Sequence, residues 1–225
     1  MTEWVLDQVD YCYKQSEVKT LDGVSGSFQT GRSYQISGAP GSGKTTILAL
    51  FAGLVVCSKG SLTFAGHELA EIDRNTYRGR ETACLFQKSS LLKDSPLANL
   101  EMEMLLSGVK STKEALKKGL LSVGLAENQL KTSVSKLTLK DRQLTALAKL
   151  LMKKSAKLIL VDEPEKVFSE CGADYAMKRL REHCLQQKKC LIFTTQSIQS
   201  VKFADELWGL NEGKLLFIKD QDPVL

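Results

Sequence analysis

The sequence predicts an α/β fold with a mixed sheet, an antiparallel β subdomain and a helical subdomain. Three observations lead to this prediction. A short strand that can be buried, Ser33–Ser37, runs into a glycine-rich loop and then into an apolar helix. The stretch Lys157–Pro164 reads as a continuous apolar strand that ends in two carboxylates, Asp162 and Glu163, as a central parallel strand does. From Leu97 onward, apolar side chains recur at helical spacing, and we expect a helical subdomain at about residues 97–150.

The first part of the chain predicts antiparallel strands. Residues 3–13 alternate enough to indicate an edge strand. Turn residues flank a second candidate strand, Leu21–Phe28, and glycines bound a third, Gly60–Gly66. We expect these segments to form antiparallel ribbons beside the strand Ser33–Ser37.

The later part mixes helices with buried strands. Leu69–Arg80 is polar and is expected to be a short helix or a loop. No repeat, low-complexity tract or linker is visible, so residues 1–225 are expected to form one domain. The remaining expected elements are strands at Thr82–Phe86 and Leu191–Thr195, a helix at Lys140–Lys153, and a hairpin of Glu206–Leu210 with Lys214–Ile218.

The glycine-rich loop predicts a phosphate-binding site. It reads Gly38-Ala39-Pro40-Gly41-Ser42-Gly43-Lys44-Thr45 and matches G-x-x-x-x-G-K-[ST] at every fixed position. Glycines let backbone N–H groups approach phosphate oxygens, Lys44 reaches the β- and γ-phosphates, and the Thr45 hydroxyl ligates Mg²⁺. Thr46 opens the expected helix Thr46–Val56, whose N-terminus attracts anions. The chain is therefore expected to bind a nucleoside triphosphate with Mg²⁺.

The amino-acid composition limits the classes of protein to which the chain can belong. With 43% hydrophobic and 25% charged residues, the 225-residue chain is ordinary for a water-soluble domain. The net charge of +5 is spread out, which argues for neither a nucleic-acid nor a lipid partner. The six cysteines lack a C-x-x-C pair, so reduced thiols are expected. The longest apolar run, Ile47–Val56, is about half of the ~20 residues of a membrane-spanning helix, and the first residues lack a signal-peptide pattern. We expect a cytoplasmic protein.

Over nearly its full length the chain resembles the nucleotide-binding subunit of ATP-binding cassette (ABC) transporters. The loop Gly38–Thr45 resembles the Walker A motif, and Leu158–Asp162 the Walker B strand, with Glu163 at the family's catalytic position. Gln87 matches the Q-loop, and Tyr13 the aromatic residue that stacks on adenine. The resemblance implies a P-loop NTPase fold with an ABC ATPase core that binds ATP and Mg²⁺.

The resemblance also implies roles for these side chains. Asp162 would hold Mg²⁺ through a water, and Glu163 would orient or deprotonate the attacking water. Gln87 would contact the metal and couple the core to the helical insert, although it can also be read as a polar residue that closes a strand. Tyr11 is an alternative to Tyr13 for stacking.

The family's signature, L-S-G-G-Q, appears in altered form as Leu137-Thr138-Leu139-Lys140-Asp141. Thr138 keeps a hydroxyl that can touch a γ-phosphate across a dimer. Both glycines are replaced, so side chains stand where bare backbone should approach phosphate. Lys140 either supplies a compensating charge or is a surface lysine.

Two further family positions differ as well. Ser169 stands at the position of the aspartate in the D-loop, and Gln196 at the position of the switch histidine. A glutamine can donate a hydrogen bond to the γ-phosphate, but it carries no positive charge. ATP binding is therefore expected, with slow hydrolysis in which Glu163 and Gln196 are the catalytic side chains.

The resemblance implies an ATP-binding subunit that works with a separate membrane permease at the cytoplasmic face and with a second ABC subunit, in a homodimer or a heterodimer. The stretch Phe86–Leu92, with Asn99-Leu100 after it, is most similar to cassettes of the lipoprotein-releasing and macrolide-efflux type. One alternative is a degenerate cassette that binds ATP but acts as a structural or regulatory subunit. Another is a soluble cassette protein of DNA repair or translation, which the absence of a basic block disfavours. No nucleic-acid partner is expected.

Overall fold

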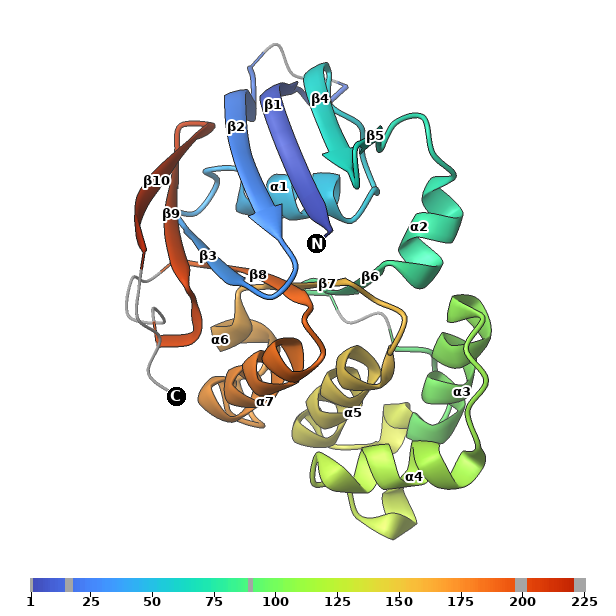
Figure 1. The fold of residues 1–225 in the computed structure, drawn as a ribbon. Helices are drawn as coiled ribbons and strands as arrows, with labels where there is room; N and C mark the ends of the chain where they lie inside the picture. Colours follow the sequence, from blue (N-terminus) through green and yellow to red (C-terminus); the bar gives the residue numbers. More distant parts are fainter. Residues whose placement is uncertain (1, 15–17, 89–90, 197–201, 221–225) are drawn as a thin grey trace.

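A computed structural model describes residues 2–14, 18–88, 91–196 and 202–220 (Figure 1). Ser89 and Ser90, which belong to the stretch Phe86–Leu92, lie outside the described residues. The strands are β1 (Glu3–Tyr11), β2 (Leu21–Gln29), β3 (Ser33–Ser37), β4 (Lys59–Phe64), β5 (His67–Glu68), β6 (Thr82–Leu85), β7 (Leu158–Asp162), β8 (Cys190–Thr195), β9 (Glu206–Asn211) and β10 (Lys214–Asp220).

Within these residues the strands form two sheets. One is a four-stranded antiparallel sheet in the order β2-β1-β4-β5, and the other is a six-stranded mixed sheet in the order β10-β9-β3-β8-β7-β6. In the mixed sheet β10 and β9 form the expected antiparallel hairpin, while β9, β3, β8, β7 and β6 run parallel. The predicted α/β fold with a mixed sheet and an antiparallel β subdomain is thus confirmed.

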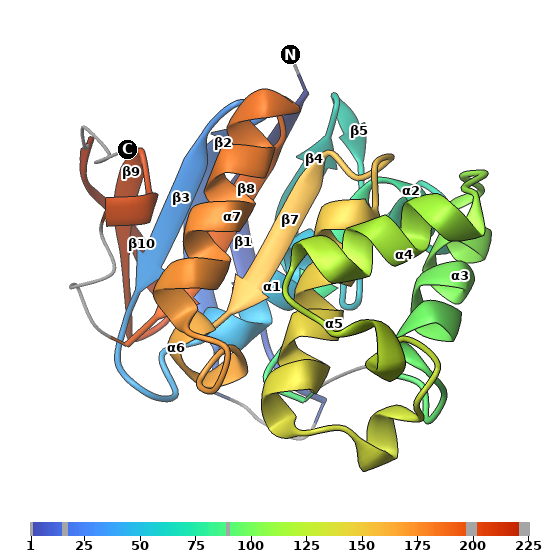
Figure 2. The same cartoon turned by 90° about the horizontal axis from the view of Figure 1, so that it is seen from below.

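Helices cover both faces of the mixed sheet. Helix α1 lies between the two sheets, whereas α5, α6 and α7 cover the opposite face, with α3 and α4 beyond them (Figures 1 and 2). The helices are α1 (Lys44–Phe51), α2 (Arg74–Arg80), α3 (Pro96–Ser107), α4 (Lys113–Ser122), α5 (Leu139–Met152), α6 (Pro164–Val167) and α7 (Ala173–Gln186), with short 3-10 turns at Glu127–Gln129 and Val134–Lys136. Among the described residues, none of the helices is both long and apolar enough to cross a bilayer.

The mixed sheet separates two apolar clusters. Successive side chains of a strand point to opposite faces, so β7 contributes to both clusters. Ile159 and Val161 pack with the helices α3, α4, α5 and α7, whereas Leu158 and Leu160 pack with α1 and the antiparallel sheet. This double burial explains why β7 is apolar without interruption until Asp162.

Residues 3–13 do not form an edge strand, which corrects the prediction for this segment. Trp4 of β1 pairs with Phe28 of β2 on one side and with Phe64 of β4 on the other. The Trp4 indole is fully buried and donates a hydrogen bond to the Tyr77 hydroxyl at 2.8 Å. Alternation of apolar and polar residues reports one buried face of a strand, but it does not report how many neighbours the strand has.

Two helices also differ from expectation. Helix α1 begins at Lys44 and ends at Phe51, rather than spanning Thr46–Val56, because Gly53 takes a left-handed conformation with φ +66° and ends the helix. Helix α7 has no counterpart among the elements expected from the sequence. Its buried residues, Ala176, Met177, Leu180, Arg181 and Cys184, lie along one side of a helix, which is the periodic pattern that would have indicated it.

Candidate nucleotide-binding and catalytic site

The phosphate loop connects β3 to α1 and requires glycine at two positions. Gly43 has φ +102°, and a Cβ atom there would lie 2.9 Å from the carbonyl oxygen of Thr20. A Cβ atom on Gly38 would lie 2.3 Å from the carbonyl oxygen of Leu210. Glycine at both positions therefore lets the loop pack closely against the neighbouring backbone at Thr20 and Leu210.

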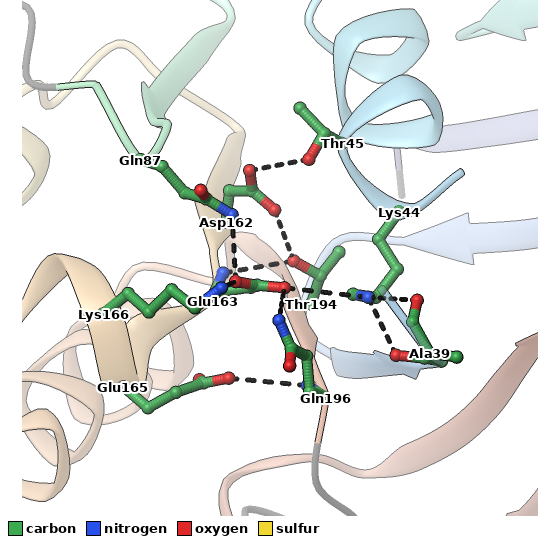
Figure 3. A network of polar contacts seen from close by, with 11 residues as sticks. Ala39, Lys44, Thr45, Gln87, Asp162, Glu163, Glu165, Lys166, Thr194 and Gln196 are labelled. Atoms are coloured by element: carbon green, nitrogen blue, oxygen red, sulfur yellow. Dashed lines mark hydrogen bonds and ion pairs between the residues drawn. The ribbon is translucent and has the colours of Figure 1, made fainter. Parts of the chain in front are cut away.

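Lys44, at the start of α1, folds its side chain back over this loop. Its ammonium donates hydrogen bonds to the carbonyl oxygens of Gly38 at 2.8 Å and Ala39 at 2.9 Å. The same nitrogen lies 3.7 Å from Oε1 of Glu163, and both side chains are only 4% exposed (Figure 3). The loop therefore already holds a shielded positive charge where an anionic ligand would enter.

Asp162 connects the phosphate loop with the neighbouring strands. Its Oδ2 accepts a hydrogen bond from the Thr45 hydroxyl at 2.9 Å, and its Oδ1 accepts one from the Thr194 hydroxyl at 2.7 Å. Asp162 and Thr194 are partners in the parallel register of β7 and β8. A carboxylate beside a hydroxyl is the hard oxygen set that Mg²⁺ prefers, so Thr45 and Asp162 fit the predicted metal site.

Glu163 follows Asp162 in a conformation that is unusual for a residue with a side chain. Its φ of 52° lies in the left-handed region, which costs about 1–3 kcal/mol in a non-glycine residue. Its backbone N–H donates to the Thr194 hydroxyl at 3.1 Å, and Pro164 begins α6 immediately after it. The turn directs the carboxylate of Glu163 toward the phosphate loop (Figure 3).

The carboxylate of Glu163 is surrounded by donors. Oε1 accepts a hydrogen bond from the Gln196 amide at 2.8 Å, and Oε2 accepts one from the Gln87 amide at 2.9 Å. Oε2 also forms an ion pair with the Lys166 ammonium (Figure 3). Burial raises the pKa of Glu163, but hydrogen bonds from Lys166 and Gln196 and the charges of Lys166 and Lys44 lower it. The net pKa lies below its ordinary value of 4.5, so the side chain is ionised at neutral pH.

Tyr13 lies at the mouth of the same site. The residue is 51% exposed, and its hydroxyl lies 2.9 Å from the Thr46 hydroxyl. Tyr11 packs against it edge-on, with ring centroids 5.1 Å apart. Only Tyr13 of this pair lines the open cleft of about 420 Å³, which is consistent with Tyr13 rather than Tyr11 as the stacking residue. The cleft is lined by Tyr13, Thr20, Pro40, Gly41, Gly43, Lys44, Thr45, Thr46, Gln87, Glu163, Lys166 and Gln196.

The altered signature lies elsewhere on the chain. Thr138 caps α5: its hydroxyl accepts the Asp141 N–H at 3.2 Å and donates to the Asp141 carboxylate at 2.6 Å. Leu139 is 47% exposed, and Lys140 is also exposed. None of the residues Leu137–Asp141, all of which are described, lines the phosphate-loop cleft. The structure therefore does not bring the signature and the phosphate loop together within one chain.

Sequence reasoning missed Thr194 and Lys166. Thr194 lies near the end of β8, beside β7, and its hydroxyl contacts both Asp162 and the backbone of Glu163. The signal for it was a polar residue near the end of the apolar strand Leu191–Thr195. Lys166 lies three residues after Glu163, a spacing that places side chains on the same side of a helical turn.

Together the fold and the site define a nucleotide-binding protein of the phosphate-loop class. Residues 21–166, more than half of the chain, match the ABC transporter family. The chain belongs to this family of ATP-binding proteins.

Similar proteins extend over almost the whole chain. It is 28% identical to the uncharacterized ABC transporter ATP-binding protein YclH of Bacillus subtilis, with 92% of each chain covered. It is 30% identical to the lipoprotein-releasing system ATP-binding protein LolD of Xanthomonas euvesicatoria, with 90% of this chain and 86% of LolD covered. The fold is similar to a dimeric post-hydrolysis state of the ATP-binding cassette MJ0796 bound to ADP and Pi, with a TM-score of 0.87 and 20% identity over 97% of this chain and 99% of that chain.

Proposed function

We propose that the chain is the ATP-binding subunit of a membrane ABC transporter and hydrolyses ATP slowly on its own. The observation that carries this proposal is the convergence of Lys44, Thr45 and Glu163 on one cleft, with Asp162 hydrogen-bonded to Thr45. Such a cleft combines a phosphate cradle, oxygen ligands and a carboxylate within reach of the same ligand.

Each side chain has a distinct task in this proposal. Lys44 and the loop N–H groups hold the phosphates, and Tyr13 stacks on the base. Thr45 and Asp162 hold Mg²⁺, with Gln87 near them, and the bound ion neutralises charge on the phosphate oxygens. Glu163 orients the attacking water and takes its proton, since it is ionised and faces the loop. Gln196 donates a hydrogen bond to the γ-phosphate without adding charge.

The proposal includes a permease and a second cassette. The relatives named above include ATP-binding components of transport systems, and the similar cassette MJ0796 is dimeric. A second subunit would bring a signature to the open cleft, which the chain's own residues Leu137–Asp141 do not reach. In this arrangement the chain lies at the cytoplasmic face and is held there by the permease.

One observation favours the alternative, a regulatory cassette with little hydrolysis. The single hydroxyl proton of Thr138 is already given to Asp141 within the cap of α5. Donating it to a phosphate on another subunit would require this bond to break, and the exposed Leu139 side chain stands beside it. The signature of this chain is therefore poorly arranged to contact a nucleotide bound to a partner subunit.

We expect weak ATPase activity from the purified chain, since a homodimer would combine the altered signature and Gln196 in every site. Losing one well-placed transition-state donor costs about 10²–10³-fold in rate, and two losses in one site nearly silence it. Gln196→His combined with Leu139→Gly and Lys140→Gly should raise steady-state phosphate release, as should pairing with a cassette that has a regular signature. If the triple variant hydrolyses ATP no faster than the wild-type homodimer, the prediction is wrong.

A further inference from the structure

Lys166 is an unassigned cation in direct contact with the proposed catalytic carboxylate. It lies on the short helix α6, three residues after Glu163, and forms an ion pair with Oε2 of Glu163. The Lys166 side chain is 51% exposed and also lines the phosphate-loop cleft, whereas the Glu163 side chain is 4% exposed. The contact therefore spans the boundary between solvent and the buried end of β7.

Four donor groups face this one carboxylate, three of them in close contact. Gln196 and Lys44 face Oε1, and Gln87 and Lys166 face Oε2. An ionised carboxylate offers about four lone-pair positions, and three of them are taken by Gln196, Gln87 and Lys166. Lys44 lies 3.7 Å from Oε1 and adds a charge without a hydrogen bond. Little acceptor capacity is left for an attacking water while these contacts persist.

Three of the four donors have another partner once a nucleotide is bound, if the proposed function is right. Lys44 would contact the phosphates, Gln87 would contact the metal, and Gln196 would donate a hydrogen bond to the γ-phosphate. Lys166 has no such task in the proposal. Its backbone is tied to Glu163 through a single turn, in which the N–H of Lys166 donates to the carbonyl oxygen of Glu163 at 2.8 Å. The ammonium therefore stays within reach of Oε2 while the other donors change partner.

We propose that Lys166 is a positioning residue that restrains the Glu163 carboxylate and slows hydrolysis within its own chain. This proposal rests on the proposed function, because it assigns Lys166 a role toward the same reaction. It differs from the effects of Gln196 and the altered signature, since Lys166 acts without a partner subunit. Removing the ammonium would free one side of Oε2 for the attacking water.

The competing role for a cation in this cleft is a direct contact with phosphate. The two roles predict opposite kinetic changes. A phosphate ligand strengthens ATP binding, so its loss raises the Kd for ATP and lowers kcat/KM. A restraint on the carboxylate leaves the Kd nearly unchanged, and its loss raises kcat.

The test compares Lys166→Ala and Lys166→Arg with the wild type in a single-turnover assay with protein in excess over Mg-ATP. We expect Lys166→Ala to hydrolyse roughly tenfold faster, because one charge-assisted hydrogen bond to the carboxylate is removed. The Kd for ATP should stay within about twofold, since the phosphate cradle is untouched. Lys166→Arg keeps a cation on the carboxylate and should remain slow.

A second measurement examines the ion pair without nucleotide. Acylation of lysines, followed by mass spectrometry, should modify Lys166 more slowly than the exposed Lys178 of α7. Glu163→Gln should raise the rate at Lys166 and leave Lys178 unchanged. Equal acylation of Lys166 in the wild type and in Glu163→Gln would overturn the proposed restraint.

The outcomes separate this inference from the function on which it rests. Equal hydrolysis by the wild type and Lys166→Ala overturns the restraint and leaves the proposed ATPase standing. A higher Kd with slower hydrolysis in Lys166→Ala overturns it in favour of phosphate binding. If both proteins bind ATP and neither hydrolyses it, the proposed hydrolysis fails, and the restraint fails with it.

Discussion

Glu163→Gln is expected to lower the rate of ATP hydrolysis by about 10²–10⁴-fold, the usual contribution of a positioned general base. Glutamine has nearly the same shape, but it cannot accept a proton from water. Its amide oxygen can still accept hydrogen bonds from Lys44 or Gln196, so the nearby phosphate loop should keep its arrangement. The measurement is single-turnover hydrolysis together with an ATP titration, in which the Kd should change little.

Glu170→Gln is a suitable control for this experiment. Glu170 is exposed, lies in the same segment after β7, and does not line the phosphate-loop cleft. The control variant should hydrolyse ATP at the wild-type rate. Wild-type turnover in Glu163→Gln would mean that another group activates the water.

Lys44→Ala is expected to weaken ATP binding by about 10–100-fold, the loss that follows from removing hydrogen bonds to a charged partner. The ammonium of Lys44 is the cation that is held against the loop carbonyl oxygens. Its removal leaves the backbone cradle intact but takes away the charge that opposes the phosphates. Isothermal titration with Mg-ATP measures the change.

Loss of fold must be distinguished from loss of binding in this variant. Lys44 is buried, and among the described residues its ammonium has polar contacts with the loop carbonyl oxygens and Glu163, so the circular dichroism spectrum of Lys44→Ala should match that of the wild type. Lys118→Ala, on the exposed side of α4, controls for the loss of one positive charge. An unchanged ATP titration in Lys44→Ala would remove the site assignment.

Local sequence was sufficient to predict the parts of the site that depend on short-range geometry. The loop Gly38–Thr45 follows the expected strand Ser33–Ser37 and leads into the expected helix, because the glycine pattern of this loop is local. The bounds of that helix were predicted less well, since it begins at Lys44 and ends at Phe51. The apolar strand within Lys157–Pro164 was also predicted, since burial on both faces removes polar residues from β7, Leu158–Asp162.

The features that sequence reasoning missed depend on distant neighbours. An internal position for β1 requires partners on both sides, Phe28 and Phe64 in the case of Trp4, and alternation along one strand does not contain that information. The bond between Thr194 and Asp162 depends on strand register across the sheet. The contact of Lys166 with Glu163 depends on the left-handed turn at Glu163, which is unusual for a residue other than glycine.

The shared strands of the mixed sheet have a consequence for local stability. Both apolar clusters include residues of β7 and β8, so loosening either cluster alone still leaves these strands packed against the other. Their amide protons should therefore exchange with solvent only through the rarest, most global openings of the molecule, whereas those of α3 and α4, which belong to one cluster, should exchange through smaller openings. Asp162 and Thr194 are therefore expected to lie on the most slowly exchanging part of the chain. The position of the Asp162 carboxylate should then be preserved during local openings of α3 and α4.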